Sequence, residues 1–128
     1  MRLVLFLFGL VIFLGCKQPT TPQTKIVTQE EMEALLQDKG VQLVDVRTPK
    51  EYNEGYIPSA INIDFLSPTF LEDIESLDKE RPIVVYCQSG GRSGKCSKKL
   101  EEAGFKKIYD LQGGYSKWKY KGSNTETR

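Results

Sequence analysis

The stretch Ile83-Val-Val-Tyr-Cys-Gln-Ser-Gly-Gly-Arg92 decides the fold. Its first four residues are apolar or aromatic and include three β-branched side chains, which predicts a short buried strand. A glycine-rich turn follows the strand at once. Beyond the turn, Cys96, Leu100 and Ala103 recur at helical spacing, and Gly104 provides a stop. A buried strand, a tight turn and a helix in this order predict one unit of an α/β fold.

The rest of the chain continues this alternation on both sides of the stretch. Further strands are expected at residues 42–46, 60–63 and 107–111, where short apolar runs occur. Helices are expected at residues 28–40, after Thr48, after Ser67-Pro68 and at residues 115–120, the last of these following a Gly113-Gly114 turn. The alternation predicts a single α/β domain with a central parallel sheet of about five strands flanked by helices.

The expected helix starts carry local signals. Thr28 and Thr48 are each followed three residues later by glutamate, which is the capping-box pattern, and a proline directly after Thr48 suits the first helical position. In the segment after Ser67, an apolar side of the helix is expected to contain Phe70, Leu71, Ile74 and Leu77. These signals place the helices between the strands, as an α/β fold requires.

Composition excludes several classes of function. The 128 residues include 18 Lys and Arg against 17 Asp and Glu, a balance that argues against a nucleic-acid partner. Histidine is absent from the sequence. This absence excludes Ser-His-Asp and Cys-His catalysis and any histidine-ligated metal site.

The N-terminal segment is interpreted as an export signal. Met1-Arg2 precedes twelve uncharged residues, 3–14, and then Gly15-Cys16, a run too short to span a membrane as a helix. The ending resembles the lipobox of bacterial lipoproteins, although Phe13 and Leu14 depart from its usual leucine and small residue. The resemblance implies a signal peptide at 1–15, a lipid on Cys16 and a flexible tether at 16–24. It places the domain outside the cytoplasm, at the periplasm or the cell surface; an uncleaved anchor or a conventional signal peptide are the alternatives.

The turn after the central strand has the chemistry of an anion cradle around a nucleophile. Cys87 stands at the carboxyl end of the strand, before a glycine-rich turn and a helix N-terminus, where backbone N–H groups stabilise a thiolate. Arg92 adds a fixed positive charge suited to an oxyanion. Gly90 and Gly91 tolerate positive φ and carry no side chain that would obstruct a ligand.

Four ordered motifs give the sequence a resemblance to the rhodanese family. They are Leu43-Val-Asp-Val-Arg-Thr-Pro-Lys-Glu-Tyr52, Gly55-Tyr-Ile-Pro-Ser-Ala-Ile-Asn62, Val85-Tyr-Cys-Gln-Ser-Gly-Gly-Arg-Ser93 and Leu111-Gln-Gly-Gly-Tyr-Ser-Lys-Trp118. The resemblance covers residues 25–120 as one domain and leaves 121–128 as a polar C-terminal tail. The sequence departs from the family pattern at Tyr56, where many members have histidine. That position belongs to a structural turn, so the departure leaves the expected chemistry unaffected.

The resemblance implies a sulfurtransferase that uses Cys87 as its persulfide-forming nucleophile. Such an enzyme moves sulfane sulfur from thiosulfate, a polysulfide or a persulfide to cyanide or a thiol, which a protein can supply. The Cys-x4-Arg spacing is that of sulfurtransferases, whereas the related phosphatases have one more residue. A non-catalytic sulfur-carrier or interaction module, and a phosphatase or arsenate reductase of similar fold, remain alternatives. No metal or organic cofactor is required.

The expected roles of the site residues follow from this resemblance and from their positions. Cys87 and Arg92 are the expected catalytic residues, and Cys87 must be exposed to react. The substrate-binding loop is expected to contain Gln88, Ser89, Gly90, Gly91 and Ser93. Asp45 and Arg47 are expected to be structural, and Asp45 is a plausible carboxylate partner for Arg92.

Cys96 has two possible interpretations. Its helical spacing favours a small core residue. The alternative is a resolving thiol that forms a disulfide with Cys87 and silences the nucleophile. The sequence leaves open whether the two sulfurs can meet.

Overall fold

The computed structural model describes residues 23–128, so the predictions for the signal peptide, Cys16 and most of the tether lie outside the described residues. The strands are β1 (Lys25–Val27), β2 (Gln42–Asp45), β3 (Ile61–Asn62), β4 (Ile83–Tyr86) and β5 (Ile108–Leu111). The helices are α1 (Gln29–Leu35), α2 (Pro49–Glu54), α3 (Phe70–Asp73), the 3-10 turn η1 (Ile74–Ser76), α4 (Gly91–Glu102) and α5 (Gly114–Tyr120). Within residues 23–128, none of these helices has the length and apolar character needed to cross a membrane.

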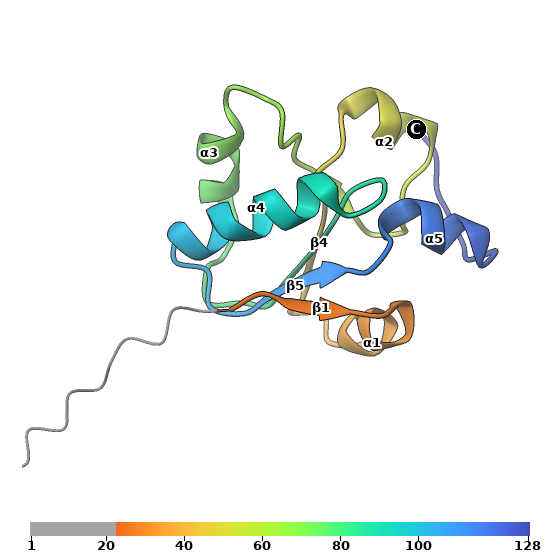
Figure 1. The fold of residues 1–128 in the computed structure, drawn as a ribbon, viewed down its shortest axis with the longest axis horizontal. Helices are drawn as coiled ribbons and strands as arrows, with labels where there is room; N and C mark the ends of the chain where they lie inside the picture. The colour runs from red at the N-terminus through yellow and green to blue at the C-terminus, as the bar shows by residue number, and fades with distance from the viewer. Residues whose placement is uncertain (1–22) are drawn as a thin grey trace, which may run out of the picture.

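The strands form one parallel sheet in the order β1-β5-β4-β2-β3 (Figure 1). The predicted α/β class and five-stranded parallel sheet are therefore confirmed. β4 occupies the centre, and its carboxyl end carries the cysteine loop. The edge strand β1 was not among the strands located from the sequence, because only Val27 of its three residues is buried.

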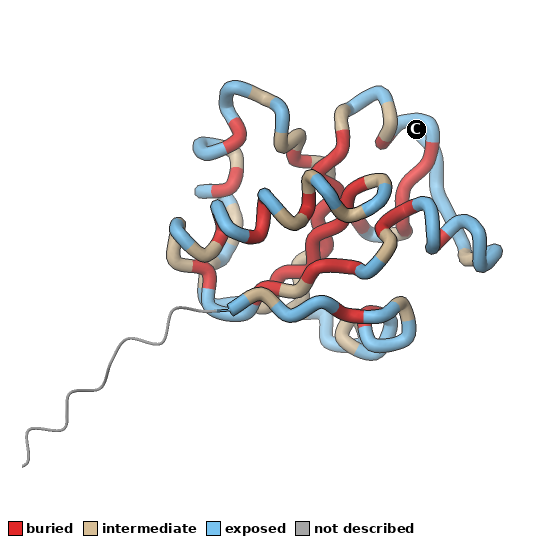
Figure 2. The backbone as a smooth tube through the Cα atoms, in the orientation of Figure 1, coloured by how far each residue is buried: buried red, intermediate tan, exposed pale blue. Residues whose placement is uncertain are grey.

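Each face of the sheet is covered by its own set of helices, so the core has two layers (Figure 2). Successive residues of β4 point to opposite faces, as strand geometry requires. Val84 and Tyr86 pack in the cluster that includes residues of α1, α2 and α5. Val85 and Cys87 pack in the cluster that includes residues of α3 and α4. This two-sided burial is why the central strand reads as a continuous apolar run.

Both capping boxes form. In each, the threonine side chain accepts from the backbone N–H of the glutamate three residues later, and the carboxylate of that glutamate accepts from the threonine N–H.

Helix α1 ends at Leu35 rather than near residue 40 as predicted. Turns occupy the residues that follow, and the Asp38 carboxylate accepts from the Gly40 N–H, an alternative to helical bonding that short polar side chains offer.

The amphipathic helix predicted after Ser67 is confirmed only in part. The segment contains the four residues of α3, followed by one 3-10 turn. Phe70 and Ile74 are buried, but Leu71 is 59% exposed. Phe70 and Ile74, four residues apart, lie on the side of the segment that faces the core, whereas Leu71 lies on the side that faces solvent.

The Gly113-Gly114 turn seats α5 against the end of β4. Both glycines have positive φ, at 77° and 56°. The turn brings the first backbone N–H groups of α5 onto the cysteine loop: Tyr115 donates to the carbonyl of Cys87 at 2.9 Å and Ser116 to that of Gln88 at 3.0 Å. A Cβ on Gly114 would collide with these same backbone groups, coming within 2.9 Å of the carbonyl carbon of Gln88. The close approach therefore requires glycine at position 114.

We predict that Gly114→Ala lowers the free energy of unfolding by about 3 kcal/mol, since it combines left-handed backbone strain with a backbone clash. The matched control is Gly122→Ala, because Gly122 also has positive φ, 72°, but a Cβ there meets no atom within 4 Å. The control should lose about 1 kcal/mol. Urea unfolding of both variants checks the difference, and equal losses would refute the backbone clash.

Candidate active site

Cys87 follows the last residue of β4 and opens a turn that leads directly into α4. Gly90 caps the helix with φ of 119°, a conformation that favours glycine. Gly91 is already helical and does not use the positive φ expected for it. The first backbone N–H bonded within the helix is that of Gly94, which donates to the carbonyl of Gly90. The N–H groups before Gly94 are thus available to an anion at the helix start.

The sulfur of Cys87 lies among these donors. The Gly90 N–H donates to Sγ at 3.0 Å, and the thiol contacts the Ser93 hydroxyl at 3.5 Å. Burial alone would raise the pKa of the Cys87 thiol. The hydrogen bond with the Ser93 hydroxyl and those from the N–H groups of Ser93, Gly90 and Ser89 outweigh burial, and they lower this pKa below its ordinary value. The arrangement favours a thiolate, which is the nucleophilic form of cysteine.

The expected exposure of the nucleophile is wrong for the residue as a whole. Cys87 is 2% exposed, because it belongs to the core between the sheet and α4. The turn residues that follow it are more open, since Ser89 and Gly91 are exposed. A reactant must therefore approach the sulfur through the turn.

Arg92 bonds to a carboxylate other than the one expected. Its Nη1 and Nη2 atoms donate to the two oxygens of Glu51 at 2.7 and 2.8 Å. Asp45, the expected partner, is instead held by Arg47, which lies only two residues away. The bonds from Arg92 lower the pKa of Glu51 to about 2, against the opposing effect of burial. Glu51 carried a sequence signal only as the capping glutamate of α2, so its contact with the cysteine loop was missed.

Arg47 and Asp45 form a buried ion pair beneath the loop, with exposed fractions of 2% and 0%. Arg47 Nε and Nη2 donate to the carboxylate, and Nη2 also donates to the carbonyl of Gly55. Burial alone would lower the pKa of Arg47, but Asp45 offsets this effect and the pKa is raised. Arg47 therefore stays charged inside the domain.

Gln88 connects this ion pair to α5. Its Oε1 accepts from Arg47 Nη1 at 3.1 Å, and its Nε2 donates to Ser116 Oγ at 2.9 Å. The side chain is thus bonded to the framework of the site. Beside it lies a small pocket of about 170 Å³, lined by Arg47, Glu51, Glu54, Gly55, Gln88, Tyr115 and Lys119.

The second thiol differs from the first in its chemistry. Cys96 is 1% exposed on the packed side of α4, as its spacing predicts. Burial raises its pKa to about 12, and the nearby Asp110 and Cys87 add to the effect. Both cysteines are free thiols in the structure. Cys96 is therefore a poor nucleophile at neutral pH.

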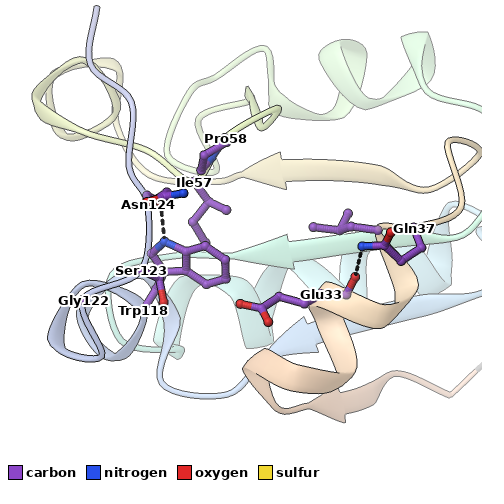
Figure 3. Close-up of a pocket in the computed structure, with 9 residues that line it drawn as sticks. Glu33, Gln37, Ile57, Pro58, Trp118, Gly122, Ser123 and Asn124 are labelled. Atoms are coloured by element: carbon purple, nitrogen blue, oxygen red, sulfur yellow. Dashed lines mark hydrogen bonds between the residues drawn. The ribbon is translucent and has the colours of Figure 1, made fainter.

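A larger pocket of about 420 Å³ lies between α1, the segment around Ile57 and the C-terminal residues (Figure 3). Trp118 forms part of its wall and donates through Nε1 to the carbonyl of Asn124. No residue of the loop 87–93 lines this pocket, and it offers no thiol. The nucleophile and the larger pocket are thus separate features.

The comparisons with known proteins agree with this architecture. A model of the rhodanese-like domain matches residues 28–121. Thiosulfate sulfurtransferase 16 of Arabidopsis thaliana is 39% identical over 97 residues, which cover 68% of this chain and 81% of the relative. The crystal structure of a rhodanese-like domain protein from Staphylococcus aureus has 34% identity and a TM-score of 0.69, covering 81% of this chain and 98% of that one.

A third similar protein is the polysulfide-sulfur transferase homodimer of Wolinella succinogenes. Its solution structure has 28% identity and a TM-score of 0.69, and the match covers 82% of this chain and 80% of that chain. The family model spans most of the described residues and includes every element from α1 to α5. The chain belongs to the rhodanese-like domain family.

Proposed function

We propose that this protein is a sulfurtransferase that carries sulfane sulfur as a persulfide on Cys87. The main observation behind this proposal is the hydrogen bond from the Gly90 N–H to Sγ at 3.0 Å, together with the lowered pKa of the Cys87 thiol. An anion held in this way is a prepared nucleophile that needs no histidine as a base. Relatives named for thiosulfate sulfurtransfer and polysulfide-sulfur transfer support the proposal.

The proposed reaction has two displacement steps. The Cys87 thiolate attacks the outer sulfur of a donor, and a new S–S bond forms as the donor's S–S bond breaks. The bonding electron pair leaves with the remainder of the donor, which is sulfite when the donor is thiosulfate. Cyanide or a thiolate then attacks the outer sulfur of the Cys87 persulfide, giving thiocyanate or a new persulfide and regenerating the thiolate. Loop N–H groups stabilise the sulfur anion in both resting forms.

A dedicated carrier that hands sulfur to one partner protein is the second candidate function. The observation that favours it is the 2% exposure of Cys87, since a recessed sulfur reacts best with an acceptor that fits the surrounding turn. A carrier would load with sulfur as an enzyme does but would transfer it slowly to cyanide or small thiols. The acceptor step therefore distinguishes the two candidates.

We predict that the reduced full chain gains one sulfur atom at Cys87 when it is treated with thiosulfate or polysulfide. Cys96→Ser should gain it equally, because the raised pKa of Cys96 keeps that thiol protonated, whereas Cys87→Ser should gain none at this site. Peptide mass mapping locates the added sulfur. Absence of sulfur on Cys87 with both donors, with the thiol confirmed as reduced, would contradict the proposed function.

The pH dependence of Cys87 reactivity gives a second prediction. Because its pKa is lowered, the thiolate should form, and alkylation should reach its plateau, at lower pH than for an ordinary cysteine. Ser93→Ala removes a hydrogen bond that stabilises the thiolate, so it should raise the pKa and move the profile to higher pH. Ser97→Ala is the control, since its hydroxyl donates to the carbonyl of Ser93 and not to the sulfur. Iodoacetamide labelling of Cys87 against pH, followed by mass mapping, measures the shift, and superimposable profiles for all three proteins would contradict it.

We further propose that the chain is exported and anchored outside the cytoplasm by a lipid on Cys16. The support is the sequence alone: a short uncharged run at 3–14 ends in Gly15-Cys16. In a bacterial host, wild-type protein should partition with membranes and carry an acyl mass on an N-terminal Cys16. Cys16→Ser should lose the acyl mass and the processing at this position. An unmodified Cys16 in mature wild-type protein would overturn the proposal.

A further inference from the structure

Arg92 is the cation of the cysteine loop, but its charge is already matched. Two of its nitrogen atoms face both oxygens of Glu51, at 2.7 and 2.8 Å. A guanidinium and a carboxylate in this paired geometry form one of the stronger charge-assisted contacts in proteins. The two side chains are 25% and 31% exposed, so the pair lies at the surface of the site rather than in the core.

Glu51 is also fixed from its other side. Its Oε2 accepts from the backbone N–H of Thr48 at 3.0 Å and from the Thr48 hydroxyl at 2.9 Å. These bonds are the capping box of α2, so moving the carboxylate away from Arg92 would also disrupt a helix start. An incoming anion therefore meets an arginine whose paired carboxylate is held in place by the fold.

The charges around the loop are balanced as a result. The side chains of the loop, the small adjacent pocket and the ion pair beneath it provide three cations and three carboxylates, which are Arg47, Arg92, Lys119, Asp45, Glu51 and Glu54. The Cys87 thiolate adds one further negative charge. The side-chain charges therefore give a doubly charged donor no net attraction, and the thiolate repels such a donor more strongly than it repels a singly charged one.

We propose that Glu51 is a specificity-determining residue that makes the site discriminate against dianionic sulfur donors and favour donors with one negative charge. The inference rests on the proposed function, because it concerns the donor that loads Cys87. Thiosulfate is then a poor sulfur donor, and monoanionic thiosulfonates and hydropersulfides are the preferred donors.

Two donors of similar shape separate charge from size. Thiosulfate gives its outer sulfur to the thiolate and releases sulfite, with a total charge of minus three before and after the step. Methanethiosulfonate gives the same sulfur and releases methanesulfinate, with a total charge of minus two. In both reactions one S–S bond forms at Cys87 and one S–S bond breaks, and the electron pair leaves with the oxidised sulfur. The donors differ chiefly in one negative charge, which a methyl group replaces.

The test is the rate constant for persulfide formation on Cys87 in the full chain, measured by quenching and peptide mass mapping with each donor. Glu51→Gln keeps a side chain suited to the capping box but removes the charge. It should raise the thiosulfate rate constant relative to that for methanethiosulfonate by about fivefold. Glu31→Gln makes the identical change in the capping box of α1, where the glutamate pairs with Lys25 and not with Arg92, and it should leave the ratio unchanged.

Wild-type protein provides an independent measurement that does not depend on any variant folding. If the site repels a dianion, raising the ionic strength should speed loading by thiosulfate more than loading by methanethiosulfonate, since salt screens the repulsion. A thiosulfate rate that falls with salt would overturn the inference. So would a Glu51→Gln protein that slows both donors equally, because Glu51 would then only position Arg92. Failure of both donors to load Cys87 would instead overturn the proposed function itself.

Discussion

The buried ion pair of Asp45 and Arg47 is the constraint on which the active end of the sheet depends. A charged pair with almost no exposure is stable only if its remaining hydrogen-bonding groups are satisfied. Arg47 meets this condition by donating to the Gly55 carbonyl and to Gln88, and its guanidinium lies 4.1 Å from the ring centroid of Tyr115. One side chain thus fixes the end of β2, the turn after α2, the cysteine loop and the start of α5. The cysteine loop and α5 are distant from Arg47 in sequence, so this one side chain joins parts of the chain that are not neighbours along it.

In the cysteine loop, the carbonyl groups hold the loop in place and the N–H groups stabilise the sulfur. The carbonyl groups of Cys87 and Gln88 accept from the first turn of α5, so the loop is held through its acceptors. The N–H groups of the loop remain available and converge on the sulfur instead. A loop that is anchored through its carbonyls and open through its donors suits an anion. The glycine at position 114 is the local requirement for this division, since α5 could not approach the loop with a side chain there.

The parts of the fold that the sequence predicts correctly are those controlled by local physics. The β-branched apolar run of β4 and the capping box at Thr48 depend on residues within one strand or one helical turn. The pairing of Glu51 with Arg92 joins residues 41 positions apart, and nothing in either local pattern indicates it. Asp45 was the expected partner for Arg92, but the Asp45 carboxylate is already bonded to Arg47, which lies two residues further along the chain. The edge strand β1 escaped prediction for a similar reason, because it is defined by its pairing with β5 and has Ile26 65% exposed.

The two thiols demonstrate that burial alone does not decide cysteine chemistry in this fold. Cys87 and Cys96 are 2% and 1% exposed, yet the pKa is lowered for the first and raised to about 12 for the second. Burial opposes ionisation of both, and Asp110 and Cys87 add to this effect at Cys96, whereas hydrogen-bond donors overcome it at Cys87. Helical bonding within α4 begins at the N–H of Gly94, which leaves the donors before it for Cys87. Cys96 lies beyond that point, where backbone N–H groups bond to carbonyls one turn earlier. The position at which α4 begins therefore selects which cysteine can become a nucleophile.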